Sequence, residues 1–341
     1  MDLLMKKYHQ VIKTLCCSLA LWFGFSAVAQ ANHKWETVKY NGQDYVTLRS
    51  VKDFYYFNKI KYGAVITMET PKVALEFRPG TQRCRMNGVL FILSHPVLER
   101  GGRYLLSKTD LIKLIDPIMR PTYIYRARHF NTVVIDPGHG GKDSGGTGPH
   151  ENEKVYTLKV ARLIKDILQR QGYRVLMTRD SDVAISLASR VRMANEYPDA
   201  IFISIHFNAG NSRANGIETF TLSPVGVPHM GRDIRAGDYR EVPGNVMDSA
   251  SIALATAVHS RALLYLNSQG SGNNFSIADR GIKRARYNVL TGIKIPAILF
   301  EGGFLSNRSE AAKVNSQAYQ KTLAAAIARA VDVYKKSVTS R

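Results

Sequence analysis

TVVIDPGHGG, residues 132–141, is the stretch that decides the fold of the second half of the chain. Its short apolar run of β-branched residues, bounded by proline and glycine, is typical of a buried parallel strand. The run leads directly to His139. Because ligands bind outside the carboxyl ends of strands in open α/β sheets, we expect His139 to lie at a functional site. The glycine spacing matches neither a dinucleotide-binding loop nor a phosphate-binding loop, which excludes both nucleotide hypotheses.

Alternating strands and helices follow residue 131, and this alternation is typical of an α/β sheet. A helix is expected to begin after a cap at Asn152 and to stop at Gly172. Its predicted apolar face holds Val155, Leu158, Ala161, Ile164 and Leu168. Further strands are predicted at 175–177, 200–206, 217–222 (an edge strand) and 297–300, and helices at 186–197, 249–266 and 309–335. We therefore expect an open, mostly parallel sheet flanked by helices.

A small α+β domain is predicted to precede this sheet, over residues 32–117. The Asn41-Gly42 pair between two alternating segments predicts a β-hairpin. Further strands are expected at 64–68, at 73–77 and, as a pair that turns at Asn87-Gly88, within 82–93. Short helices are expected after Ser50 and from Ser107 to about Ile115. Prolines and a basic run at residues 118–130 indicate a linker, so the second domain covers residues 131–341.

The first 31 residues have the pattern of a secretory signal peptide. Three lysines precede the apolar stretch 15–25, and small residues before Gln30 and Asn32 offer two cleavage positions. An uncleaved membrane anchor is the alternative, but the apolar run is shorter than a spanning helix requires. We therefore expect an exported protein, in a periplasm or in the cell wall and extracellular space, that meets a membrane only during export.

Charge and cysteine content narrow the choice of partners. Loss of the signal removes three lysines and one aspartate, which lowers the net charge from +20 to +18. Such a charge favours an anionic partner, for example a cell-wall polymer, an anionic lipid surface or released nucleic acid. No basic groove interleaved with stacking aromatic residues is visible, so we expect no nucleic acid. Cys84 is the only cysteine after the signal and cannot form an internal disulfide.

Three predicted buried strands lead to a potential metal ligand or base, namely His139, His206 and Glu301. A catalytic zinc takes three such protein ligands and keeps one position open, and two histidines with one carboxylate are a known set. The remaining zinc ligand is expected from a loop or helix start beside His139. Glu153 is the best-placed carboxylate for this role, and Glu151 is the alternative. A zinc ion would activate water, and Glu301 fits the carboxylate that takes the proton of this water and passes it on.

Five motifs, in this order, resemble the zinc-dependent N-acetylmuramoyl-L-alanine amidases of the Amidase_3 type. The motifs are DPGHGG (136–141), the Glu153-Lys154 pair, SIHFNA (204–209), DRGIK (279–283) and FEGGFLSN (300–307). The resemblance covers about residues 131–335. It implies that His139, Glu153 and His206 bind Zn²⁺ and that Glu301 is the catalytic acid/base, and it favours Glu153 over Glu151. Residues 32–117 weakly resemble a copper-amine-oxidase N-terminal-like domain, which implies a wall-binding or spacer role.

The amidase resemblance implies an exported peptidoglycan hydrolase. The bond cut would be the amide between N-acetylmuramic acid and L-alanine. Another zinc cell-wall peptidase and a non-catalytic wall-binding protein are the alternatives, although a binding module has no need of all four residues. Asn208, Arg280 and Lys283 are candidates for orienting the substrate, and each could equally stabilise a loop.

The resemblance also raises the question of regulation. The stretch 224–245, rich in glycine and proline, falls where some family members carry a segment that blocks the zinc until an activator protein withdraws it. We therefore expect a possible activator partner, with this stretch as the gate. The loop after His139, KDSGGTGPHEN, lacks the alanine that the family commonly has beside the glycine, and this departure concerns only the shape of the loop.

Overall fold

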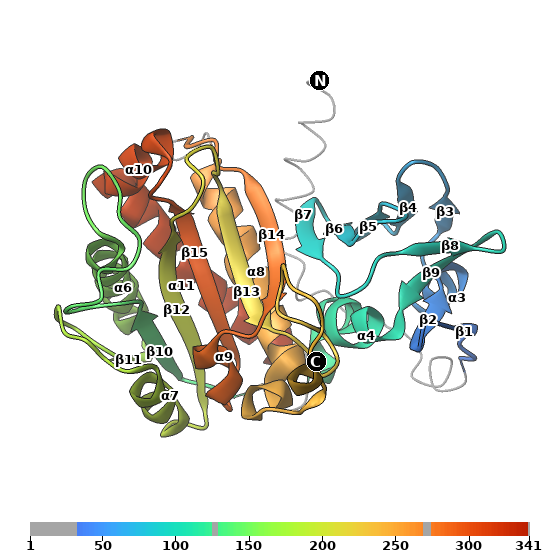
Figure 1. Ribbon diagram of the computed structural model, residues 1–341, viewed down its shortest axis with the longest axis horizontal. Coiled ribbons are helices and arrows are strands. Elements are labelled where there is room, and N and C mark those ends of the chain that lie inside the picture. The colour runs from blue at the N-terminus through green and yellow to red at the C-terminus, as the bar shows by residue number, and fades with distance from the viewer. Residues whose placement is uncertain (1–32, 125–128, 269–273, 340–341) are drawn as a thin grey trace. The chain divides into compact units, whose positions relative to one another are not determined.

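The computed structural model describes residues 33–124, 129–268 and 274–339, which form two compact units (Figure 1). The first unit extends to Pro121, and the second runs from Thr122 to Thr339. The predicted signal peptide and most of the basic run at 125–129 lie outside the described residues. Within the described part, no helix combines the length and the apolar character that crossing a membrane requires.

The first unit contains two antiparallel sheets. One has the order β1-β2-β9-β8 and the other, within this unit, has the order β7-β6-β5-β4-β3. The strands are β1 (Thr37–Tyr40), β2 (Gln43–Thr47), β3 (Lys59–Lys61), β4 (Ile66–Glu69), β5 (Ala74–Phe77), β6 (Arg83–Met86), β7 (Val89–Ile92), β8 (Leu98–Arg100) and β9 (Arg103–Ser107). Asn41 and Asn87 take positive φ at the predicted turns, as two-residue hairpin loops require.

Short helical pieces complete the first unit. Helix α3 (Leu48–Phe54) begins at Thr47, whose hydroxyl accepts from the Ser50 amide. A second helical stretch comprises α4 (Lys108–Asp110), η1 (Leu111–Ile115) and α5 (Asp116–Met119). The predicted cap at Ser107 is present, because its hydroxyl accepts from the Asp110 amide at 2.9 Å. The stretch continues past the predicted end at Ile115, since helical backbone persists through Met119.

The second unit is built on a mixed sheet with the order β11-β10-β12-β15-β13-β14. Neighbouring strands are parallel except β13 and β15, so the predicted α/β sheet, mostly parallel and flanked by helices, is confirmed. The strands are β10 (Thr132–Pro137), β11 (Arg174–Met177), β12 (Ala200–Asn208), β13 (Ile217–Leu222), β14 (Asp279–Ala285) and β15 (Ala297–Phe304).

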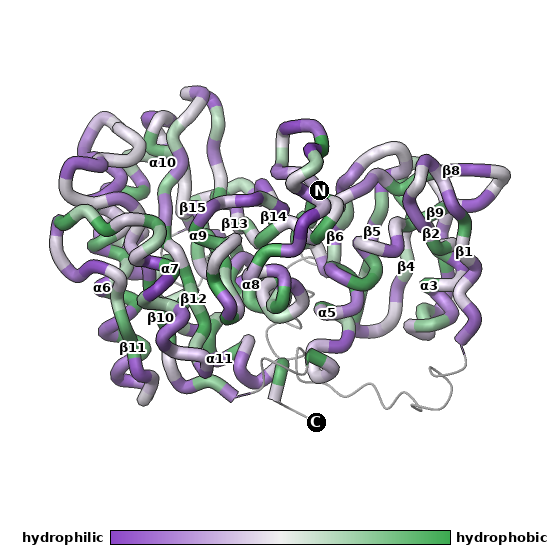
Figure 2. The backbone as a smooth tube through the Cα atoms, turned by 60° about the horizontal axis from the view of Figure 1, so that its bottom comes forward, coloured by the Kyte–Doolittle hydropathy of each residue, from purple (hydrophilic) through white to green (hydrophobic). Residues whose placement is uncertain are grey.

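Helices cover both faces of this sheet (Figure 1). Helix α11 (Gln317–Thr339) packs between α6 (Glu153–Arg170) and α8 (Asp248–Leu266) on one face. Helices α7 (Leu187–Asn195) and α9 (Asn288–Gly292) lie on the other, in a core with alternate residues of β12, β13 and β15. In Figure 2 the tube is largely green along β12 and α8, because both elements are buried and apolar.

Strand β13 is internal, and the predicted edge position is wrong. All six of its residues are buried, because β15 pairs with it on one side and β14 on the other. Strand β14 has the sequence DRGIKRA, in which charged residues conceal the apolar alternation of a strand. Strands β12 and β15 also continue beyond His206 and Phe300, so Glu301 lies within its strand.

Two predicted helices differ in detail. Helix α6 turns Tyr156, Val160 and Ala161 inward, whereas Val155 and Leu158 are half-buried, so the predicted apolar face is only partly correct. The predicted helix 309–335 is two helices, α10 (Arg308–Asn315) and α11. The chain is extended at Ser316, whose hydroxyl accepts from the Tyr319 amide and thereby ends one helix and starts the next.

Candidate metal centre

His139 lies immediately beyond β10 in a strained turn. Its φ of 60° is in the left-handed region, which costs a residue with a Cβ atom about 1–2 kcal/mol. Buried Arg190 holds the turn by donating to the carbonyls of Pro137 (2.7 Å) and His139 (2.8 Å). Asp136 accepts from the same guanidinium at 2.5 Å. Each charge-assisted bond contributes about 1.5–3 kcal/mol, so the network outweighs the strain.

Two glycines make room for the imidazole rings. A Cβ atom at Gly138 would lie 2.3 Å from the His206 ring. One at Gly145 would lie 2.6 Å from the His139 ring and from the carboxylate of Glu153, and Gly145 also has a φ of +65°. The glycines of this region therefore serve the close approach of side chains, which is a different use from the phosphate loops excluded above.

His139, Glu153 and His206 converge, and their potential ligand atoms lie within 4.8 Å of one another. The Glu153 carboxylate is 3.1 Å from Nε2 of His139 and 2.8 Å from Nδ1 of His206. The two imidazole rings stand edge to face, with centroids 4.9 Å apart. Glu153 is the first residue of α6 and is 4% exposed, whereas its competitor Glu151 is exposed on the preceding loop.

The charges at the centre support a cation. Burial raises the pKa of Glu153, but hydrogen bonds with His139 and His206 outweigh it and hold this pKa well below its usual range. For His139, burial lowers the pKa, and the bonds to Glu153 and Asp143 reverse the effect and raise it. A metal ion binds the ionised carboxylate and the neutral imidazole, so the lowered pKa of Glu153 suits metal binding.

Asp143, which sequence reasoning missed, orients His139. Its carboxylate is 2.9 Å from Nδ1 of the ring, and its other oxygen accepts from the Gly145 amide. A proton on Nδ1 leaves Nε2 facing Glu153. A carboxylate, a histidine and a metal arranged in this way form a common support for metal ligands.

Glu301 lies beside this group, since β12 and β15 pair His206 with Glu301. The side chain is 8% exposed, and among the described residues its Oε2 atom has no hydrogen-bond partner. Burial, followed by the charges of Glu153 and Glu218, raises the pKa of Glu301 well above its usual value. A carboxyl whose pKa is raised in this way suits the transfer of a proton.

Glu218 is a second residue that sequence reasoning missed. It pairs with Glu301 across β13 and β15 and is 4% exposed. Its carboxylate binds Nε of Arg280 and, at 2.9 Å, Nζ of Lys283. Two of the predicted substrate-binding residues therefore meet at one buried carboxylate. The signal that could have found Glu218 is a lone carboxylate in the segment IETFTL, whose other residues are apolar residues and threonines.

Asn208, the third predicted substrate-binding residue, ends β12. Its carbonyl accepts from the Leu305 amide at 2.7 Å. Within the described residues, its side-chain amide nitrogen is buried and lacks a hydrogen-bond partner. The Asn208 side chain therefore keeps an unsatisfied buried donor at the carboxyl edge of the sheet.

The stretch 224–245 is held away from the convergent ligands by its own contacts. Since β13 runs antiparallel to β15, the stretch leaves β13 at the end opposite Glu218 and Glu301. Arg232 binds the buried carboxylate of Asp238, and Arg286 donates to the carbonyls of Pro224 and Asp238. These contacts give the gating hypothesis no support.

The arrangement fits a catalytic zinc ion. Two imidazole nitrogens and one carboxylate converge from three separate elements, a set that binds Zn²⁺ and leaves a fourth position for water. Two histidines outside this group have other partners: His259 is buried and bonded to Asp279 and Thr219, and His229 accepts from the Arg286 amide.

Comparison with known proteins gives a consistent result. The Amidase_3 family model, described as N-acetylmuramoyl-L-alanine amidase, matches residues 133–333. The uncharacterized protein YqiI of Bacillus subtilis is 32% identical over 203 residues, which cover 60% of this chain and 84% of that protein. The N-acetylmuramoyl-L-alanine amidase AmiC of Escherichia coli is 30% identical over 249 residues. That match covers 67% of this chain and 59% of AmiC.

A solved structure is similar to the same part of the chain. The catalytic domain of CwlV, an N-acetylmuramoyl-L-alanine amidase from Paenibacillus polymyxa, is 30% identical. It matches with a TM-score of 0.48, covering 60% of this chain and 98% of the CwlV domain.

Proposed function

This chain belongs to the N-acetylmuramoyl-L-alanine amidase family Amidase_3, and we propose that it is a zinc-dependent, exported enzyme of peptidoglycan. It hydrolyses the amide between the lactyl group of N-acetylmuramic acid and L-alanine. The observation that carries the proposal is the convergence of His139, Glu153 and His206 beside buried Glu301.

The roles of the residues follow from their surroundings. His139, Glu153 and His206 would hold the zinc, which would act as a Lewis acid and would lower the pKa of a bound water towards ~7. Asp143 keeps His139 in the orientation that binding requires. Glu301 accepts the proton of the attacking water and donates it to the leaving nitrogen, so that the amine departs neutral. Its raised pKa suits the second of these transfers.

The substrate is bound along the carboxyl edge of the sheet. Asn208 donates its unpaired amide to the substrate. Arg280 and Lys283 orient the peptide and are themselves positioned by Glu218. The negative charge of the wall polymer is attracted by the strongly basic chain, which raises the encounter rate.

Export rests on residues 1–31, and dependence on an activator protein stays a prediction. N-terminal sequencing of the exported protein is expected to begin at Gln30 or Asn32. An intact Met1 terminus on the exported protein would instead favour an uncleaved anchor. Comparing digests by the purified protein with and without an extract of the wall compartment tests for an activator.

Mass spectrometry of digested peptidoglycan tests the activity. The mature protein is compared as isolated, after chelation, and after zinc is restored. Peptides with a new N-terminal alanine, lost on chelation and regained with zinc, are the expected result. Cuts elsewhere in the peptide would identify another zinc wall peptidase, and wall binding without cleavage would identify a binding protein.

A further inference from the structure

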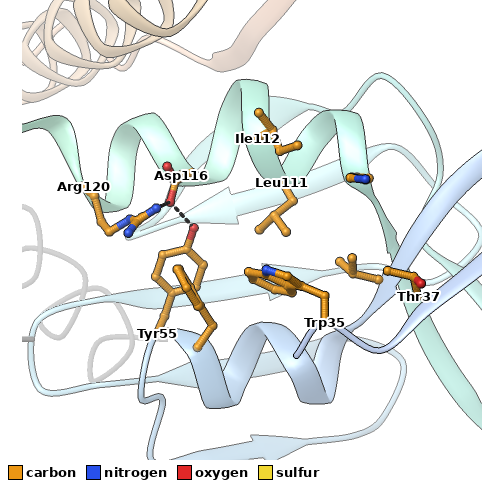
Figure 3. A pocket seen from close by; sticks show the side chains of 10 residues that line it. Trp35, Thr37, Tyr55, Leu111, Ile112, Asp116 and Arg120 are labelled. Carbon is orange, nitrogen blue, oxygen red and sulfur yellow. Dashed lines mark hydrogen bonds and ion pairs between the residues drawn. The ribbon is translucent and has the colours of Figure 1, made fainter. Parts of the chain in front are cut away.

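The first unit contains a cavity of about 250 Å³ that opens between α3 and the helical stretch α4-η1-α5. Figure 3 shows Trp35 and Tyr55 on one side of the pocket, with Leu111 and Ile112 on the other. Phe54 also lines it. All of these residues belong to the first unit, so the pocket is a property of this unit by itself.

The aromatic side chains that line the pocket pack against neighbouring side chains. The rings of Trp35 and Phe54 lie 4.7 Å apart, and His33 meets Trp35 edge to face at the same distance. The guanidinium of Arg120 lies over the ring of Phe54, with its Cζ atom 4.9 Å from the ring centroid. Because these rings pack against one another, the protein side chains would lose little conformational entropy when a ligand binds.

The charges inside the pocket are already compensated. Asp116 accepts from the Tyr55 hydroxyl at 2.5 Å and from Nε of Arg120 at 2.7 Å. Lys108 and Thr37 are exposed at the rim. The pocket therefore presents apolar walls and a polar rim, and its interior carries no net charge that would select an ion.

This combination selects a ring with one apolar face and a polar edge. The volume is below the range of about 300–1,000 Å³ for drug-sized ligands, so a single ring fills it. The C–H groups on one face of a pyranose carry partial positive charge and complement the negative face of an indole. The hydroxyl groups at the edge of the sugar then reach Thr37 and Lys108. An acyl chain would leave these rim groups unused.

We propose that this pocket binds one pyranose unit of a glycan chain. That the glycan is the peptidoglycan strand rests on the proposed function of the second unit. The pocket then retains the protein on the strand between cuts. Its binding of sugar does not depend on the metal centre.

Tryptophan fluorescence tests the proposal directly. The chain has two tryptophans, Trp22 and Trp35, and removal of residues 1–31 leaves Trp35 alone. The probe is a tetramer of N-acetylglucosamine, which has no lactyl amide and cannot be cleaved by an amidase. The expected result is a saturable change in emission. No change, or a change produced only by decanoate or trialanine, would overturn the proposal.

A pair of substitutions locates the binding. Ile112→Glu places a charge in the pocket at a position that is 48% exposed, and Val65→Glu makes the same change at a 37% exposed position that does not line it. I112E is expected to weaken tetramer binding by about tenfold or more, and V65E to leave it within twofold. Equal affinities for both variants would overturn the assignment.

Both variants are also assayed on a soluble muropeptide. Rates equal to that of the unsubstituted protein are expected, and thermal unfolding checks that both variants are folded. If the protein binds the tetramer but cleaves no peptidoglycan, the proposed function is refuted and the sugar-binding proposal is supported. If it cleaves peptidoglycan but does not bind the tetramer, the sugar-binding proposal is refuted and the proposed function is supported.

Discussion

His206 and Glu301 stand side by side on the parallel strands β12 and β15, in direct register. The same strand β15 pairs Glu301 with Glu218 on its other side. A histidine that faces the cation site and two buried carboxylates therefore follow one another across three strands. The sheet register thus sets which charged groups surround Glu301.

Glu301→Gln removes the proton acceptor and keeps the shape of the side chain. We expect the rate of peptidoglycan cleavage to fall by about 10²–10⁴-fold, the usual contribution of a general acid/base. Zinc content, measured by elemental analysis, is expected to stay near that of the unsubstituted protein. The matched control is Glu151→Gln, an exposed carboxylate whose loss is expected to leave the rate within twofold. Equal losses in both variants would contradict the role of Glu301.

Glu218→Gln removes one of the negative charges that raise the pKa of Glu301. The cations Arg280 and Lys283 then lie nearby without their carboxylate, which lowers this pKa further. A base with a lower pKa stays ionised at lower pH. The acidic limb of the profile of kcat/KM against pH is therefore expected to move to lower pH. A limb that moves to higher pH would show that Glu218 acts differently.

Gly138→Ala is expected to abolish zinc binding. The added Cβ would lie 2.3 Å from the His206 ring, which is anchored by Glu153 and has to leave its position. Gly210→Ala is the control, because no atom lies within 4 Å of the added Cβ and no positive φ is strained. Metal content after dialysis measures the effect. Stoichiometric zinc in G138A would refute the prediction.

Asp143→Ala leaves the Nδ1 atom of His139 without its carboxylate partner. Zinc affinity is expected to fall by about 10–100-fold, as for other supports of metal ligands. Competition with a chromophoric chelator measures the affinity. The exposed Asp199→Ala variant is expected to be unchanged, so an equal loss there would point to a general effect of charge.

Asp238→Asn tests the anchor of the stretch 224–245. A hydrogen bond from Arg232 lowers the pKa of Asp238, against the opposing effect of burial. We expect a loss of about 2 kcal/mol in the free energy of unfolding, since a buried charged partner is removed.

The sign of the pH effect follows from the lowered pKa of Asp238. Its stabilisation is complete above the unfolded pKa of about 3.9 and is lost as the pH falls towards the folded value. The difference in Tm between D238N and the unsubstituted protein is therefore expected at pH 6 and should shrink below about pH 4. A difference that grows in acid would contradict the assignment.

Local sequence determined much of this protein. Apolar runs bounded by glycine and proline predicted β10 and β12, Asn-Gly pairs predicted the β1-β2 and β6-β7 hairpins of the first unit, and the motifs contain His139, His206 and Glu301. These features depend on residues close together in the chain, because turns, caps and burial patterns act over a few positions. The charged strand β14 lacks such a local pattern, and it was missed.

Only the tertiary structure decided which of these residues meet. The pairing of β13 between β15 and β14 places Glu218 beside Glu301, and the entry of α6 turns Glu153, rather than Glu151, between the two histidines. The antiparallel pairing of β13 with β15 also places the start of the stretch 224–245 at the end of β13 opposite Glu218 and Glu301. The physical reason is that strand order and register depend on packing between segments that are distant in the chain. The local sequence of one strand does not identify the strand that pairs with it.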